Sequence, residues 1–109
     1  MTIGIERILK IDPILFFEKM NPLGKQYRIE GVNTANEINT ANEDRTIDVI
    51  GLFAKRVPEG AEWVIGYDVV VGGAGGGENS YDYGFMVIQT GLALIPVTEP
   101  KKDEPKKFD

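Results

Sequence analysis

Carboxylates are the side chains of this sequence with the chemistry for proton transfer or for binding a hard cation. The 109 residues contain no cysteine and no histidine, which excludes disulfide frameworks, zinc and iron–sulfur sites, thiol nucleophiles and imidazole catalysis. Asp68, Glu78 and Asp82 are candidate ligands of calcium or magnesium, because both ions prefer oxygen. Solvent-facing carboxylates on strands are the more ordinary explanation, so the existence of a metal site stays open. No catalytic residue and no cofactor is expected.

A glycine-rich segment between these carboxylates has the composition of a phosphate-binding loop but not its spacing. Residues 72–80 contain five glycines, Gly72, Gly73, Gly75, Gly76 and Gly77. No Lys-Ser/Thr pair follows them, Glu78 adds a negative charge, and an aromatic strand pattern follows where a dinucleotide fingerprint requires a helix. The segment therefore predicts a flexible hairpin loop. Such loops can become ordered on a partner, so a binding role stays open.

Two long strand patterns flank this loop. Apolar residues occupy alternate positions over 61–71, and the second pattern, 81–97, is apolar on both faces between Phe85 and Ile95. In a domain of this size, covering both faces needs a helix layer plus a partner subunit, or a central place in a sandwich. We expect Gly84 and Gly91 to mark bulges or close backbone contacts. The expected oligomer interface consists of Phe85, Met86, Val87, Ile88, Leu92 and Leu94.

The N-terminal half predicts two helices and a third strand. Asp12 before a proline is typical of an N-cap followed by the first helical residue, which predicts a helix over 12–21. Strict alternation near 26–32 predicts a strand. Apolar residues over 44–57 recur at helical spacing, with Asp44 as a candidate cap. The β-branched content of that segment also allows a strand, and helix is favoured.

The pentapeptide Asn-Thr-Ala-Asn-Glu occurs twice, at 33–37 and 39–43. One interpretation is a stacked solenoid or a repeated carboxamide surface for binding ice, sugar or calcium. Two copies are too few for a solenoid, which needs at least three stacked units. The polar composition instead favours a surface loop with Asx turns.

Charge and hydropathy restrict the partners. Lys and Arg number 12 against 17 Asp and Glu, giving a net charge of −5, which repels nucleic-acid phosphates. The segment 98–109 carries four lysines and four carboxylates, and its prolines make it a disordered tail after a single domain over 1–97. No apolar run approaches the ~20 residues of a spanning helix, and no secretory signal is recognised. No membrane partner is expected, and the cytoplasm is the expected compartment.

The segment Glu59-Gly60-Ala61-Glu62-Trp63-Val64-Ile65-Gly66-Tyr67-Asp68, followed later by Gln89-Thr90-Gly91-Leu92-Ala93-Leu94, resembles the heavy-metal-binding (YbjQ-like) family of small uncharacterised proteins. The resemblance covers residues 52–97 and depends on small-residue strand signals. It implies an α+β subunit that assembles into a ring-like oligomer without an established activity. The family's metal label finds no soft ligand in this chain, because cysteine and histidine are missing.

Together these patterns predict an α+β fold. A long antiparallel β-hairpin (61–71 and 81–97) and a strand near 26–32 would form the sheet, with one or two short helices (12–21 and 44–57) on one face. The function predicted is that of a non-catalytic structural or assembly subunit forming a homo-oligomer. The alternative is a small binding module that holds a protein partner or a hard cation through the glycine-rich loop and nearby carboxylates.

Overall fold

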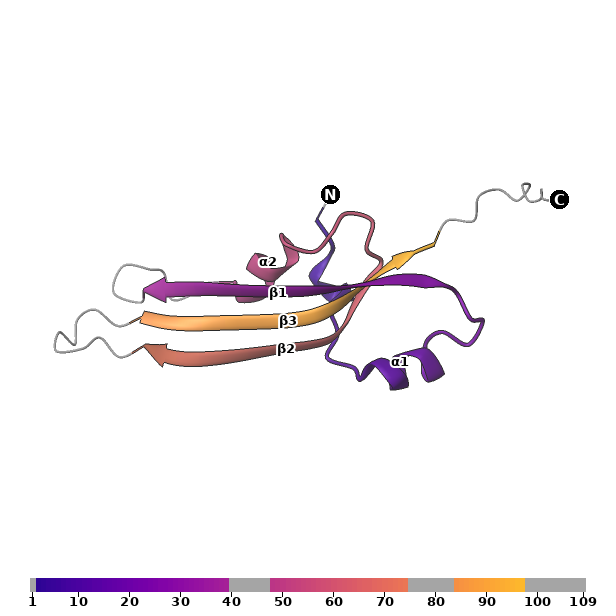
Figure 1. Ribbon diagram of the computed structural model, residues 1–109, viewed down its shortest axis with the longest axis horizontal. Coiled ribbons are helices and arrows are strands. Elements are labelled where there is room, and N and C mark those ends of the chain that lie inside the picture. The colour runs from indigo at the N-terminus through magenta and orange to yellow at the C-terminus, as the bar shows by residue number, and fades with distance from the viewer. Residues whose placement is uncertain (1, 40–47, 75–83, 98–109) are drawn as a thin grey trace.

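The computed structural model describes residues 2–39, 48–74 and 84–97 (Figure 1). Three long strands form one antiparallel sheet in the order β1-β3-β2, so that β3 is central. The elements in chain order are η1 (Ile5–Arg7), α1 (Pro13–Lys19), β1 (Tyr27–Asn39), α2 (Val49–Ala54), β2 (Trp63–Ala74) and β3 (Gly84–Pro96). The predicted α+β class is confirmed. The predicted tail, 98–109, lies outside the described residues.

The two hairpin strands form where alternation predicted them, with one irregularity in β2. The register of β2 on β3 shifts between Ile65 and Asp68, so that two residues of β2 face one of β3. Gly66 lies within this bulge and has φ 64°, which glycine adopts without steric cost. The bulge is therefore in β2 and not at Gly84, whereas Gly91 makes the close contact expected of it, because a Cβ there would lie 2.7 Å from Val64 Cγ1.

The strand predicted near 26–32, which is β1, is longer than predicted. β1 continues beyond 26–32 to Asn39 and pairs with β3 without interruption, from Tyr27 opposite Pro96 to Asn39 opposite Gly84. The surface-loop prediction for the first repeat copy, 33–37, is therefore wrong. A complete ladder of backbone hydrogen bonds to the central strand outweighs the low strand propensity of asparagine. In the second copy, residues 40–43 lie outside the described residues.

The first helix begins at the predicted cap. One carboxylate oxygen of Asp12 accepts hydrogen bonds from the backbone N–H groups of Ile14 and Leu15, at 3.0 and 3.2 Å. Pro13 occupies the first helical position, where its missing N–H costs nothing. The predicted helix over 12–21 is thus confirmed, although its regular part is shorter.

The second helix confirms the preference for helix over strand in 44–57, but a different residue caps it. The Asp48 carboxylate accepts the Gly51 N–H at 3.0 Å at the start of α2. Asp44, the expected cap, lies outside the described residues.

The two helices cover opposite faces of the sheet, whereas the sequence analysis placed the helices on one face. Phe16 of α1 packs with Ile65 and Leu94, and Phe53 of α2 packs in the cluster that contains Val64 and Ala93. Successive residues of a strand point to opposite faces. We call these the α1 face and the α2 face. One buried phenylalanine therefore anchors each helix on its own side of the sheet.

The segment before α1 pairs with the outer edge of β2. The Leu9 N–H donates to the Val64 carbonyl at 2.8 Å, and the Gly66 and Tyr67 N–H groups donate to the carbonyls of Ile11 and Leu9, each at 2.9 Å. This pairing closes the edge of β2 only around the bulge.

Candidate functional site

The three candidate cation ligands are not brought together by the described structure. Asp68 lies exposed on β2, directly after the bulge and opposite Thr90. Glu78 and Asp82 lie outside the described residues. Within 2–39, 48–74 and 84–97, no group of three acidic side chains is placed to hold a metal ion.

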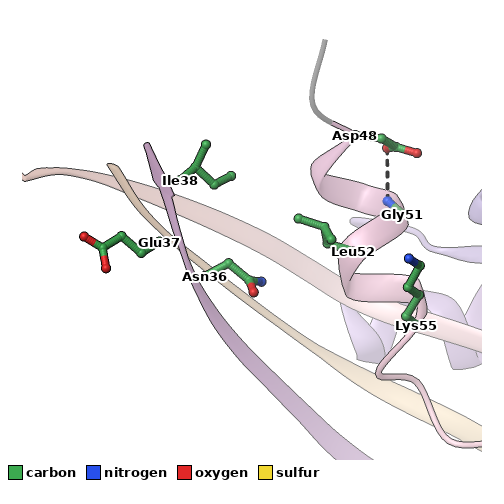
Figure 2. Close-up of a pocket in the computed structure, with 7 residues that line it drawn as sticks. All are labelled: Asn36, Glu37, Ile38, Asp48, Gly51, Leu52 and Lys55. Carbon is green, nitrogen blue, oxygen red and sulfur yellow. Dashed lines mark hydrogen bonds between the residues drawn. The ribbon is translucent and has the colours of Figure 1, made fainter. Parts of the chain in front are cut away.

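A groove of about 410 Å³ lies between β1 and α2 (Figure 2). On its polar side, Asp48 already accepts the Gly51 N–H as a helix cap. Figure 2 shows Glu37 pointing away from α2, which leaves Asn36 and Lys55 as the remaining polar side chains on the helix side. The described lining of the groove thus presents one amide, one ammonium group and the apolar side chains of Ile38 and Leu52.

A polar cluster, missed by the sequence analysis, joins the beginnings of β1 and β2. Tyr27 donates its hydroxyl proton to Glu62 at 2.8 Å, and the Lys25 ammonium lies 3.0 Å from the same carboxylate oxygen. The hydrogen bond from Tyr27 holds the pKa of Glu62 below its ordinary value. Burial, followed by the bond to Glu62, raises the pKa of Tyr27 to about 12. Because a catalytic acid or base needs a pKa near the working pH, both shifts favour a structural role.

A second polar group lies buried beneath α2. Tyr67 donates its hydroxyl proton to the side-chain oxygen of Gln89, which is completely buried. Thr34 stands opposite Gln89 in the ladder. In the described part of the chain, neither the Thr34 hydroxyl nor the Gln89 amide nitrogen has a hydrogen-bond partner. A buried polar atom without a partner costs about 1–3 kcal/mol, so this group weakens the centre of the fold.

Beyond α1, no element of the described residues covers the α1 face. Figure 1 shows the strands continuing past this helix toward the other end of the sheet. There Met86 and Ile88 are 38% and 43% exposed although they belong to the central strand. Ile88 stands in one cross-strand row with Ala35 of β1 and with Val70 of β2, which is 56% exposed. We call Met86, Ile88, Val70 and Ala35 the bare patch.

The structure separates the six residues predicted to form an oligomer interface. Met86 and Ile88 belong to the bare patch. Phe85 is 37% exposed but lies on the α2 face, opposite Ile38. The other three lie within the subunit, where Val87 and Leu94 are buried and Leu92 is partly buried against the cluster around α1.

Comparison of the chain with known protein families, curated proteins and solved structures finds no match. The class of the protein therefore follows from its fold, an α+β domain with a three-stranded antiparallel sheet that the described helices cover over part of its length. Among residues 2–39, 48–74 and 84–97, no helix is long and apolar enough to cross a membrane.

Proposed function

We propose that the protein is a non-catalytic assembly subunit that forms a homo-oligomer by burying the bare patch. The observation that carries this proposal is the exposure of Met86 and Ile88 on the central strand. Strands flank β3 on both sides, so these side chains are exposed because no described element covers their face. An apolar row across all three strands is typical of an interaction surface.

The size of the patch indicates how strong the association is. Met86, Ile88 and Val70 are already partly covered, so complete burial gains about 1 kcal/mol for each side chain. Association costs about 4–15 kcal/mol in lost freedom of motion. Two copies together gain about 6 kcal/mol in this way, so the patch alone supports only weak, reversible association, and a multimer at micromolar concentration needs a further contact between the subunits. Because each subunit carries a net charge of −5, added salt should strengthen the assembly by screening the repulsion.

The electrostatics of the described residues also favour a structural role. The pKa of Glu62 is lowered and that of Tyr27 is raised, so both groups keep one protonation state at neutral pH. Groups that keep one protonation state can orient chain segments but do not transfer protons. The negative net charge makes nucleic acid an unfavourable partner, and we expect the assembly in the cytoplasm.

Light scattering of the full chain at micromolar concentration tests the proposal, and we expect a multimer. Met86→Lys should shift the protein toward the monomer, because a charge would replace an apolar contact. Phe85→Lys is the matched control, since the two residues are neighbours with 38% and 37% exposure on opposite faces. A wild-type monomer at every soluble concentration would overturn the proposal. Equal effects of the two variants would move the interface away from the bare patch.

A further inference from the structure

The outer edge of β2 has two parts that differ in what they pair with. The first part, around Val64 and Tyr67, forms hydrogen bonds with Leu9 and Ile11 of the same chain. From Asp68 onward, no described segment pairs with this edge. The chain thus extends its own sheet beside the start of β2 and leaves the remainder open.

The open part presents unpaired backbone groups. Asp68 stands opposite Thr90, and Val70 stands opposite Ile88. The Tyr67 N–H points outward to Leu9. Because residues of an antiparallel ladder alternate in direction, the N–H and C=O groups of Val69 and Val71 face away from β3. Such an edge is a template for another strand.

The side chains of this edge favour pairing. Val69, Val70 and Val71 are consecutive β-branched residues, which suit strands. Val70 and Val71 are 56% and 59% exposed. Asp68 is the one charged residue of β2, and the strand contains neither the lysine nor the proline that commonly protects an edge.

The outer edge of β1 is different. Its strand carries Arg28, Glu30, Glu37 and several asparagines, and Arg28 forms a 3.0 Å ion pair with Glu30. Charged residues of this kind disfavour association between edges. A second strand is therefore expected at β2 and not at β1.

We propose that two copies of the chain pair antiparallel through the open part of β2, about a two-fold axis at Val71. This inference rests on the proposed homo-oligomer and adds a backbone contact to the burial of the bare patch. Val71 then exchanges two backbone hydrogen bonds with Val71 of the partner subunit, and Val69 exchanges two with Gly73 of the partner subunit. The partner strand stays clear of Tyr67, whose N–H is bonded to Leu9. The product is a continuous six-stranded sheet in which the two bare patches lie side by side on one face, where further copies can bury them.

This register also separates the acidic residues. Asp68 lies opposite the partner's Ala74, so the two Asp68 positions are six residues apart along the strands. That spacing corresponds to about 20 Å at the usual rise of a strand. The separation exceeds the Debye length of about 8 Å at physiological salt, so the carboxylates do not oppose pairing.

Single cysteine variants test the register, because the chain contains no cysteine of its own. In the proposed dimer the two Val71 positions form a hydrogen-bonded pair, with Cα atoms about 5.5 Å apart, within the range of a disulfide. Val70→Cys is the matched control. Its two copies are diagonal neighbours about 7–8 Å apart, which is too far for a disulfide. Under mild oxidation, Val71→Cys should shift to a covalent dimer, and Val70→Cys should remain monomeric on a denaturing gel.

Amide exchange of the wild-type chain provides an independent measurement. The Val69 and Val71 amides should exchange more slowly as the protein concentration rises. If light scattering shows a multimer but these amides exchange freely, or if Val71→Cys links no faster than Val70→Cys, the pairing of β2 strands is overturned while the proposed assembly stands. A wild-type monomer at every concentration would overturn both.

Discussion

The same three strands behave differently at the two ends of the sheet. In the packed half, where α1 lies, Phe16 covers Leu94 on one face and Phe53 packs with Ala93 on the other. In the bare half, toward Gly84, Met86 and Ile88 keep 38% and 43% of their surface exposed. Both halves alternate apolar side chains in the same way. The difference teaches that alternation specifies a strand, whereas the covering elements decide whether its apolar face stabilises the subunit or remains for a partner.

The largest difference between the halves should be the loss of unfolding free energy when a phenylalanine of each half is replaced by alanine. Phe53 lies in the packed half and is completely buried, so its replacement by alanine removes a ring from the core. Phe53→Ala should lower the free energy of unfolding by about 3–5 kcal/mol, as measured by urea denaturation. Phe85→Ala in the bare half should cost about 1–2 kcal/mol, because 37% of its surface is already exposed. Equal losses would contradict the division into two halves.

Two glycines, one in each half, allow the packing of the halves to be compared by the addition of one methyl group. A Cβ at Gly91 would lie 2.7 Å from Val64 Cγ1 and 3.2 Å from Phe53 Cζ. Gly91→Ala should therefore cost about 1–3 kcal/mol of overpacking. Gly72→Ala is the matched change in the bare half, where the nearest atom is the Met86 carbonyl oxygen at 3.9 Å.

Thermal unfolding followed by circular dichroism would compare the two variants. We expect Gly72→Ala to leave the melting temperature unchanged or slightly raised, because alanine restricts the unfolded chain. A loss in Gly72→Ala as large as that in Gly91→Ala would show that the bare half is as tightly packed as the other.

Local signals in the sequence were sufficient to predict most elements. Asp12 before Pro13 identified the first helix, because a cap and a fixed φ act within one turn. Alternation identified both hairpin strands, since a period of two needs no knowledge of the neighbours. The first repeat copy, 33–37, was predicted wrongly, because its strand structure depends on pairing with β3 and not on its own composition.

Features that depend on distant residues could not be read from the sequence. The doubly apolar stretch 85–95 indicated that something must cover both faces of β3. It did not indicate that the chain itself covers Leu94 and Val87 while it leaves Met86 exposed. The contact between Tyr27 and Glu62 spans 35 residues, and no spacing rule connects two positions so far apart.

Two threonines allow the cost of the unpartnered Thr34 hydroxyl beneath α2 to be compared with the effect of the same substitution on the α1 face. The Thr34 hydroxyl is buried and has no partner within the described residues. Thr34→Val keeps the shape and removes this polar atom, so it should raise the free energy of unfolding by about 1 kcal/mol in urea. Thr90→Val, on the half-exposed α1 face of the neighbouring strand, should change it by less than about 0.5 kcal/mol. A destabilised Thr34→Val would mean that the hydroxyl makes a favourable bond in solution.

The smallest expected effect is a pH dependence that belongs to the packed half. Glu62 has a lowered pKa, mainly because Tyr27 donates a hydrogen bond to its ionised form. This stabilisation is present above the ordinary value of 4.5 and is lost as the pH falls below it. The raised pKa of Tyr27 acts in the opposite direction, since the folded state favours the neutral phenol and stability is lost between pH 10.0 and about 12.

Tyr27→Phe distinguishes the pH dependence due to the hydrogen bond between Tyr27 and Glu62 from that of the other titrating groups. Without the hydroxyl, the loss of unfolding free energy should become smaller in both pH windows, by less than about 1 kcal/mol because the ion pair between Lys25 and Glu62 is partly exposed to solvent. Some alkaline loss should persist, because burial also raises the pKa of Tyr67. Melting curves of both proteins across the two windows measure the effect. Superimposable pH profiles would show that the hydrogen bond between Tyr27 and Glu62 does not hold the beginnings of β1 and β2 together, so that the packed half is stabilised by its apolar core and strand pairing.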